Sequence, residues 1–173
     1  QKIKALEQFR VISLSHKNLS VEEVGLFHIP DELLRERIQT LLQLSGIEEV
    51  MFLSTCNRVE FLLSSAKDFD PVFLEKFLST AYPEKPLEEI RRILDHTDKF
   101  KGEEAVLHLF KVASSLDSLI IGEREIITQV RNAYEVSRKL EGTADLIRLV
   151  IKKTIEVGKE VYTETNISRN PVS

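Results

Sequence analysis

The chain has 173 residues, of which 42% are hydrophobic and 30% charged, so it can bury a core, and a disordered or fibrous segment is excluded. Its net charge of −4 excludes a generally basic nucleic-acid-binding surface, so any such contact needs a local patch. A single cysteine excludes an intramolecular disulfide framework and fits a reducing cytosol, and no apolar run is long enough to span a membrane. We therefore expect a cytoplasmic protein with no membrane partner.

The first hundred residues alternate short apolar runs with helical patterns. Residues 1–8 are either a helical turn or a lead without structure of its own. Strands are predicted at 9–14, 49–53 and 59–64, with a last short strand between 95 and 101. Ser20 and Glu23 have the spacing of a capping box, which indicates a helical turn. Longer helices are predicted from residue 30 to the break at 45–46, from 71 to about 80, and around 87–94.

From residue 102 the pattern changes to three long helices, at 103–116, 123–140 and 143–164, with Thr143 a candidate N-cap for the last. The preceding order of strand, helix, strand, strand, helix, strand predicts an α+β fold. Its core is a ferredoxin-like split βαβ sheet, to which the C-terminal helices are added. We expect the lead at 1–8, a main domain at 9–141, and at 142–173 a connecting helix with the start of a further domain.

The stretch from Ser54 to Arg58 contains the only cysteine, Cys56, between two apolar strands. The end of a strand is a place where a rigid scaffold presents a side chain to a ligand, and the nearby Arg58 cation favours a thiolate. Cysteine is also a common core residue, but Thr55 and Asn57 are polar neighbours that a core position disfavours. The residues alone leave both a nucleophile and a core cysteine open.

Other polar residues are weaker candidates. His108 falls at the edge of the apolar face of its helix, where it is either a partly buried side chain or an acid–base group. The histidines and the cysteine have no spacing typical of a metal site, so we expect no metal. The last helix also has a basic side, which is either a solvated face or a nucleic-acid contact and is formed by Arg148, Lys152 and Lys159.

The cysteine stretch, together with Glu60, resembles the signature of the glutamyl-tRNA reductases, which make glutamate 1-semialdehyde for tetrapyrrole (porphyrin and heme) synthesis. Other segments resemble that family in the same order along the chain: 15–17, 105–110, 112–119, 122–123, 129–130 and 163–167. The resemblance implies an NADPH-dependent oxidoreductase in which Cys56 attacks the ester of glutamyl-tRNA. The resulting thioester is electrophilic enough to accept a hydride.

The resemblance also implies roles for other residues. His108 orients the ester or shuttles a proton. Arg58 binds the glutamate carboxylate bidentately; the residues by themselves leave open a surface ion pair of Arg58 with Glu60 or another acid. Thr55 and Ser118 bind the glutamyl group. The residues by themselves leave open that Thr55 closes a turn and that Ser118 caps a helix. The implied substrate-binding set is Thr55, Asn57, Arg58, Ser118, Glu123, Arg124 and Gln129.

The chain departs from the family at three places. Ser115 replaces a usual glycine, residues 22–25 replace a segment with an Arg-Glu pair, and Arg124 stands where relatives often carry Gln or Pro. No Gly-x-Gly-x-x-Gly is present, so the implied NADPH site lies outside this chain. Implied partners are glutamyl-tRNA, glutamate-1-semialdehyde aminomutase, and a second copy joined through a C-terminal domain that this chain lacks.

Two other functions fit the same residues. One is a Cys-dependent thioesterase or hydrolase that uses Cys56 and His108 on simple esters. The other is a non-catalytic α/β interaction module with Cys56 in its core.

Overall fold

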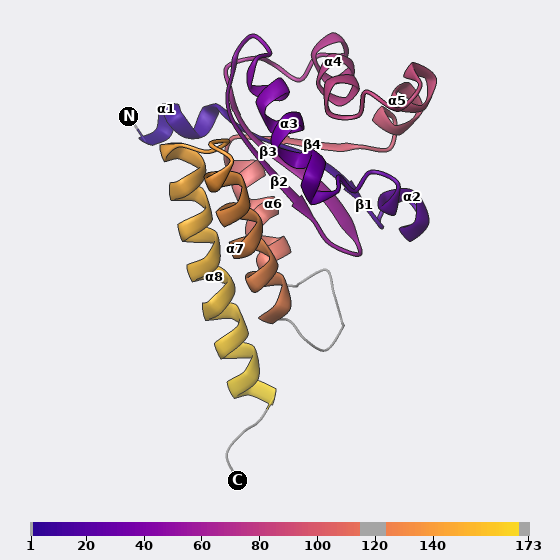
Figure 1. The fold of residues 1–173 in the computed structure, drawn as a ribbon. Helices are drawn as coiled ribbons and strands as arrows, with labels where there is room; N and C mark the ends of the chain where they lie inside the picture. Colours follow the sequence, from indigo (N-terminus) through magenta and orange to yellow (C-terminus); the bar gives the residue numbers. More distant parts are fainter. Residues whose placement is uncertain (1, 115–123, 170–173) are drawn as a thin grey trace.

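The computed structural model describes residues 2–114 and 124–169, in which strands and shorter helices precede two longer helices, α7 and α8 (Figure 1). In chain order the elements are α1 (Lys2–Glu7), β1 (Phe9–Ser15), α2 (Val21–Gly25), α3 (Asp31–Leu42), β2 (Ile47–Ser54), β3 (Arg58–Ser65), α4 (Pro71–Ala81), α5 (Leu87–Leu94), β4 (Asp98–Lys101), α6 (Glu103–Ala113), α7 (Arg124–Lys139) and α8 (Asp145–Arg169).

The four strands form one antiparallel sheet in the order β2-β3-β1-β4. Since β1 and β2 each pair antiparallel with β3, they run in the same direction on either side of it. The mixed α/β architecture with an antiparallel sheet is therefore confirmed. Strand β2 begins at Ile47, earlier than the predicted residue 49, because a register irregularity between Ile47 and Glu49 lets the pairing continue past a bulge.

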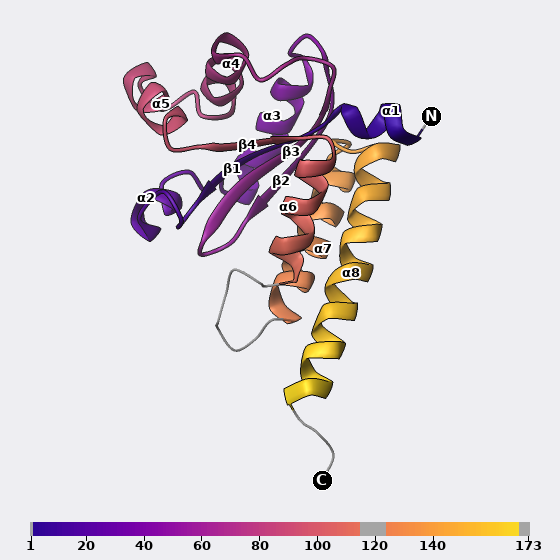
Figure 2. The ribbon, with the colours of Figure 1, turned by 180° about the vertical axis from the view of Figure 1, so that it is seen from behind.

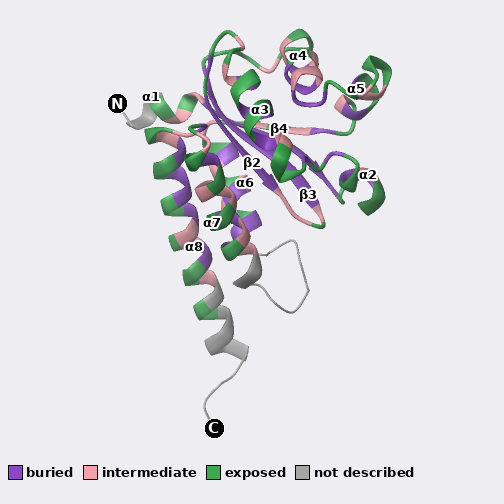
Figure 3. Ribbon diagram, viewed as in Figure 1, coloured by how far each residue is buried: buried purple, intermediate pink, exposed green. Residues whose placement is uncertain are grey.

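Helices cover both faces of the sheet, with α6, α7 and α8 along one face and α3 and α4 on the other (Figures 1 and 2). Successive side chains of a strand point to opposite faces, so β1 sends Ile12 and Leu14 into one core and Phe9 and Val11 into the other. Strands β1, β2 and β3 are accordingly buried along most of their length, whereas β4 alternates half-buried and exposed residues (Figure 3). Among the described helices none is long and apolar enough to cross a membrane.

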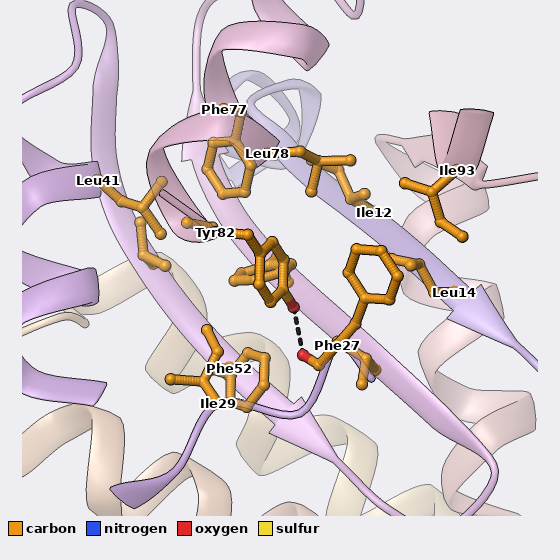
Figure 4. Close-up of a cluster of buried hydrophobic side chains, with 14 of the residues drawn as sticks. Ile12, Leu14, Phe27, Ile29, Leu41, Phe52, Phe77, Leu78, Tyr82 and Ile93 are labelled. Atoms are coloured by element: carbon orange, nitrogen blue, oxygen red, sulfur yellow. Dashed lines mark hydrogen bonds between the residues drawn. The ribbon is translucent and has the colours of Figure 1, made fainter. Parts of the chain in front are cut away.

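The core beneath α3, α4 and α5 is built around aromatic rings (Figure 4). Tyr82 is buried there, and its hydroxyl donates to the Phe27 carbonyl oxygen at 2.5 Å. The two rings also meet edge to face, with centroids 5.0 Å apart. The hydroxyl thus satisfies a backbone acceptor that burial would otherwise leave without a partner.

Side-chain acceptors explain two helix starts. The backbone N–H of Glu23 donates to the Ser20 side chain, which confirms the capping residue expected for α2. Helix α8 begins at Asp145, later than the sequence suggested. Its acceptor comes from β2, because the N–H groups of Ala144 and Ile147 donate to Glu49 Oε1 at 2.5 and 3.1 Å. The candidate cap Thr143 was therefore wrong, because a carboxylate from the sheet interacts with the positive end of the helix.

The link between α7 and α8 is joined to the edge strand through Gly142. Its N–H donates to the Ser137 carbonyl oxygen at 2.8 Å, and its own carbonyl accepts from the Val50 N–H at 2.7 Å. A Cβ at this position would lie 2.5 Å from the Val50 carbonyl oxygen. Only glycine allows this approach, which fixes the C-terminal helices against the sheet.

Candidate active site

The turn between β2 and β3 presents Cys56. The pair Ser54 and Val59 ends the strand pairing, and the Thr55 N–H donates to the Arg58 carbonyl oxygen at 2.9 Å. The Thr55 side chain closes the turn, since its Oγ1 accepts from the Asn57 N–H at 3.2 Å. Cys56 itself is exposed. It is therefore not a core cysteine, and its thiol is accessible at the tip of a turn held by two buried strands.

A second turn supports the first. The His16 N–H, just after β1, donates to the Asn57 carbonyl oxygen at 3.0 Å, and His16 Nδ1 lies 3.4 Å from the same oxygen. The expected substrate-binding residue Asn57 thus contributes its backbone to the structure of the turn, while its side chain is half-buried. This contact also brings Lys17, the next residue, beside the cysteine turn.

The carboxylate of Glu60 connects three elements behind the turn. Glu60 is completely buried, and its Oε2 accepts from Ser13 Oγ of β1 at 2.7 Å and from Arg58 Nη1 of β3 at 2.9 Å. The same oxygen lies 2.7 Å from His108 Nε2 of α6. The second oxygen, Oε1, is buried and makes no hydrogen bond with any of the described residues.

Electrostatics favour the ionised form of this carboxylate. Burial by itself raises the pKa of Glu60, but the hydrogen bond and charge of His108, the charge of Arg58 and the Ser13 hydroxyl together outweigh it. The pKa of Glu60 therefore lies below its ordinary value. A buried anion with three donors on one oxygen holds those donors in fixed positions.

His108 is fixed from two sides. Its ring stacks on Phe100 with centroids 4.2 Å apart and planes 14° from parallel, and its side chain is only 12% exposed. An ionised carboxylate only accepts hydrogen bonds, so Nε2 carries a hydrogen and donates it to Glu60. Nδ1 is then the ring nitrogen that remains for other chemistry. The predicted position of His108, at the edge of the apolar face of α6, is confirmed by its half-buried state beside buried Leu109.

Arg58 forms an ion pair with Glu60, as the alternative interpretation of the sequence proposed, but the pair is buried. The Arg58 side chain is 7% exposed and that of Glu60 is 0% exposed. The expectation of a surface pair was therefore wrong. The reason is that both side chains point from β3 to the face that α6 covers, where water does not screen their attraction.

Two hollows lie close to the cysteine turn. The first, the His108 hollow, has a volume of about 260 Å³ and is lined by Lys17, Phe100, Glu104, Leu107, His108 and Lys111. The second, the Gln129 hollow, has a volume of about 210 Å³ and is lined by His28, Ile29, Asp31, Leu34, Phe52, Ser54, Gln129, Asn132, Ala133 and Val136. In the second, His28 Nδ1 lies 2.9 Å from Ser54 Oγ.

The structure thus brings most of the predicted site residues to one end of the sheet. Gln129 is half-buried and lines its own hollow, which Ser54 of the cysteine stretch shares. Of the remaining predictions, Ser118 and Glu123 lie outside the described residues, and Arg124 begins α7 but its side chain is not described.

Sequence reasoning missed four contributors, which are Ser13, His28, Phe100 and the central role of Glu60. A signal for Glu60 was present, since Arg58 and Glu60 are two residues apart in a strand and so share one face. No such signal exists for the others, because their partners are distant in the chain.

The described residues do not fit a dinucleotide. Gly102 is the glycine that joins a described strand, β4, to a described helix, α6, and it is not part of a glycine-rich turn. The first turn of α6 carries Glu103 and Glu104, which would repel a pyrophosphate. Within the same residues, no group of three or more His, Cys, Asp or Glu side chains is arranged to hold a metal ion.

Comparison with known proteins gives consistent matches. Residues 12–165 match the family described as glutamyl-tRNAGlu reductase, N-terminal domain. The chain is 37% identical over 164 residues to the glutamyl-tRNA reductase of Cyanothece sp., and 37% identical over 168 residues to that of Cyanophora paradoxa. Each alignment covers 94% of this chain and 37% of the relative.

Among solved structures, the glutamyl-tRNA reductase of Methanopyrus kandleri superposes with a TM-score of 0.71 at 31% identity. That match covers 94% of this chain and 36% of the other. The chain therefore spans little more than a third of the length of the proteins it resembles.

Proposed function

The chain belongs to the glutamyl-tRNA reductase family, and we propose that it carries out the acyl-transfer step of that reaction, in which glutamyl-tRNA is converted to a Cys56 thioester. The observation that carries the proposal is the exposed Cys56 on a turn fixed by two buried strands and by the His16 contact. A positioned, accessible thiol is what attack on an acyl carbon requires.

The step balances without any other reactant. The Cys56 sulfur forms a bond to the ester carbonyl carbon, the bond from that carbon to the ribose oxygen breaks, and the thiol proton ends on the ribose hydroxyl that leaves. His108 moves that proton through Nδ1, since Nε2 is held by Glu60 at 2.7 Å. Glu60 acts through His108 and Arg58, and is a positioning residue.

Arg58, Thr55, Asn57, Gln129 and Ser118 complete the proposed substrate site. Arg58 binds the glutamate side-chain carboxylate with guanidinium donors other than the Nη1–H that donates to Glu60. Thr55 is the neighbour of Cys56 in the turn and Gln129 lines the neighbouring hollow, which supports a glutamyl-binding role for each. Glu123 and Arg124 remain in the proposed substrate-binding set as their motif positions imply.

Reduction of the thioester to glutamate 1-semialdehyde, for tetrapyrrole synthesis, uses the hydride chemistry of NADPH. Since the described residues do not fit a dinucleotide, we assign the NADPH site to a part of the protein outside this chain, and no step of the acyl transfer depends on it. The wider proposal includes cytoplasmic localisation, the aminomutase as the enzyme that takes the product, and a homodimer formed outside this chain.

The fold suits this role. We propose that the sheet is of the ferredoxin-like kind, because the order β2-β3-β1-β4 with β1 and β2 in the same direction is what a split βαβ arrangement produces. Residues 9–141 are proposed as the catalytic domain and 142–173 as the connection to the next domain. The first turns of α8 nevertheless pack in the second core, through Ile147, Val150 and Ile151.

The proposal is tested by trapping the acyl group. The chain is incubated with glutamyl-tRNA, quenched in acid and measured by intact mass spectrometry, with Cys56→Ser as the control. A glutamyl adduct on the native chain and none on Cys56→Ser is expected. In parallel, Cys56 should react quickly with iodoacetamide in the folded state. Lack of an adduct with glutamyl-tRNA, combined with turnover of simple esters, would instead identify a hydrolase.

A further inference from the structure

We propose that the His108 hollow binds the phosphate and ribose of the 3′-terminal nucleotide of the tRNA, with Lys17 and Lys111 as the phosphate-binding side chains. This inference rests on the proposed function and adds the surface that receives the RNA end. The hollow lies between the β1–α2 turn, β4 and α6, and is lined by Lys17, Phe100, Glu104, Leu107, His108 and Lys111.

The hollow lies in the right place for the nucleotide that carries the ester. Lys17 follows His16, whose N–H donates to the Asn57 carbonyl oxygen at 3.0 Å, and Asn57 is the neighbour of Cys56. The opposite wall includes His108, the proposed proton carrier. The ribose of the terminal nucleotide must reach the cysteine for transfer to occur, so its phosphate has to be accommodated close to this turn.

Charge distinguishes this hollow from the Gln129 hollow. Lys17 and Lys111 are exposed and come from elements far apart in the sequence, so that only the tertiary fold places them on one hollow. Glu104 is the acid of the same lining. The Gln129 hollow contains Asp31 and no lysine or arginine. Because a phosphate is attracted by ammonium groups and repelled by a carboxylate, the RNA end enters on the lysine side.

The remaining lining suits a sugar and a base edge. Leu107 is 55% exposed and Phe100 is half-buried, so both provide apolar surface next to the lysines. At about 260 Å³ the hollow is smaller than a typical cofactor pocket, which begins at about 300 Å³. A single nucleotide unit matches this mixture of charge and apolar surface better than a dinucleotide does. The local lysine pair also explains how an acidic chain, with net charge −4, engages RNA.

The test compares two substrates that share the glutamyl ester but differ in RNA. The double variant Lys17→Glu/Lys111→Glu is assayed for Cys56 acylation by glutamyl-tRNA and by the p-nitrophenyl α-ester of glutamate. A second variant, Lys17→Gln/Lys111→Gln, removes the charges without adding repulsion. The matched control Lys76→Glu/Lys139→Glu makes the same change in net charge at two exposed lysines on α4 and α7.

We expect the rate constant with glutamyl-tRNA to fall about tenfold or more for each lysine reversed, as when a charge-assisted hydrogen bond is removed. The slope of log rate against log salt should become shallower by about one for each phosphate that the variant no longer binds. The rate of acylation by the small ester should stay within about twofold of the native rate. The control variant Lys76→Glu/Lys139→Glu should change the rate with either substrate only by the small, salt-screened effect of its altered net charge.

Three results would overturn the inference. One is an unchanged rate of acylation by glutamyl-tRNA in the double variant, another is an equal loss of rate with both substrates, and the third is an equal loss of rate in the control variant.

The small ester also separates this inference from the proposed function, because its failure to acylate the native chain would count against Cys56 chemistry itself. Anisotropy titration with non-aminoacylated tRNAGlu, in a Cys56→Ser background, measures RNA binding without any chemistry. Equal affinity with and without the Lys17→Glu/Lys111→Glu substitutions would refute the inference.

Discussion

Replacing Glu60 by glutamine tests whether the buried carboxylate organises the site. Glu60 is completely buried, and Ser13, Arg58 and His108 all donate to, or lie within hydrogen-bonding distance of, the same oxygen. Glutamine keeps the shape but loses the charge, and its amide adds two donors where the neighbours are donors already. Arg58, with a side chain only 7% exposed, would then lose its buried ion pair with Glu60.

The expected cost is about 3 kcal/mol of unfolding free energy, the lower end for breaking one partner of a buried ion pair. With an m-value of about 2 kcal/mol per M, the midpoint of urea unfolding should fall by about 1.5 M. Far-UV circular dichroism is the appropriate signal, because the chain has no tryptophan. As control, Glu135→Gln removes the anion from an exposed pair with Arg138, and its midpoint should not move measurably.

The pH dependence provides an independent check. The pKa of Glu60 is lower in the folded state than its ordinary value of 4.5, so the charge stabilises the fold fully above 4.5. That contribution is lost as the pH falls through the folded pKa. The gap in stability between the native chain and Glu60→Gln should therefore be largest at neutral pH and narrow below 4.5. Equal midpoints at pH 7, or a gap that does not change between pH 7 and pH 3, would refute the reasoning.

Three further substitutions have definite outcomes. Gly142→Ala should cost about 1–3 kcal/mol, because its Cβ would meet the Val50 carbonyl oxygen at 2.5 Å, whereas Gly25→Ala, with nothing within 4 Å, should leave the urea midpoint unchanged or slightly raised. Tyr82→Phe should lower the free energy of unfolding by about 1–3 kcal/mol, since it leaves a buried carbonyl without its 2.5 Å donor; an unchanged midpoint would show that water replaces the hydroxyl. Arg58→Lys should lower the second-order rate constant for acylation of Cys56 by glutamyl-tRNA by the equivalent of about 1.5–3 kcal/mol, because lysine cannot form a bidentate pair, and a near-native rate would exclude carboxylate binding by Arg58.

Sequence reasoning was most successful where local rules decide the outcome. The order of the elements, the capping role of Ser20 and the position of Cys56 in a turn between two strands all follow from periodicity, caps and turn residues within a few positions of one another, whereas the exposure of Cys56 came only from the structure. It failed at Thr143, because the acceptor at the start of α8 is Glu49, which is distant in the chain. It also considered an ion pair of Arg58 only as a surface pair, because nothing near Arg58 in the sequence shows that α6 covers it.

By itself, then, the sequence determined the helices and strands, the cysteine turn and the family resemblance, since each of these is carried by neighbouring residues or by ordered motifs. The tertiary structure alone decided that Glu60 joins Ser13, Arg58 and His108 around one oxygen, and that Lys17 and Lys111 face the same hollow. These groupings depend on how the sheet and α6 pack, which no local pattern encodes. The physical reason is that a buried charge has to find its partners across elements, and those partners are set by the packing of the whole domain.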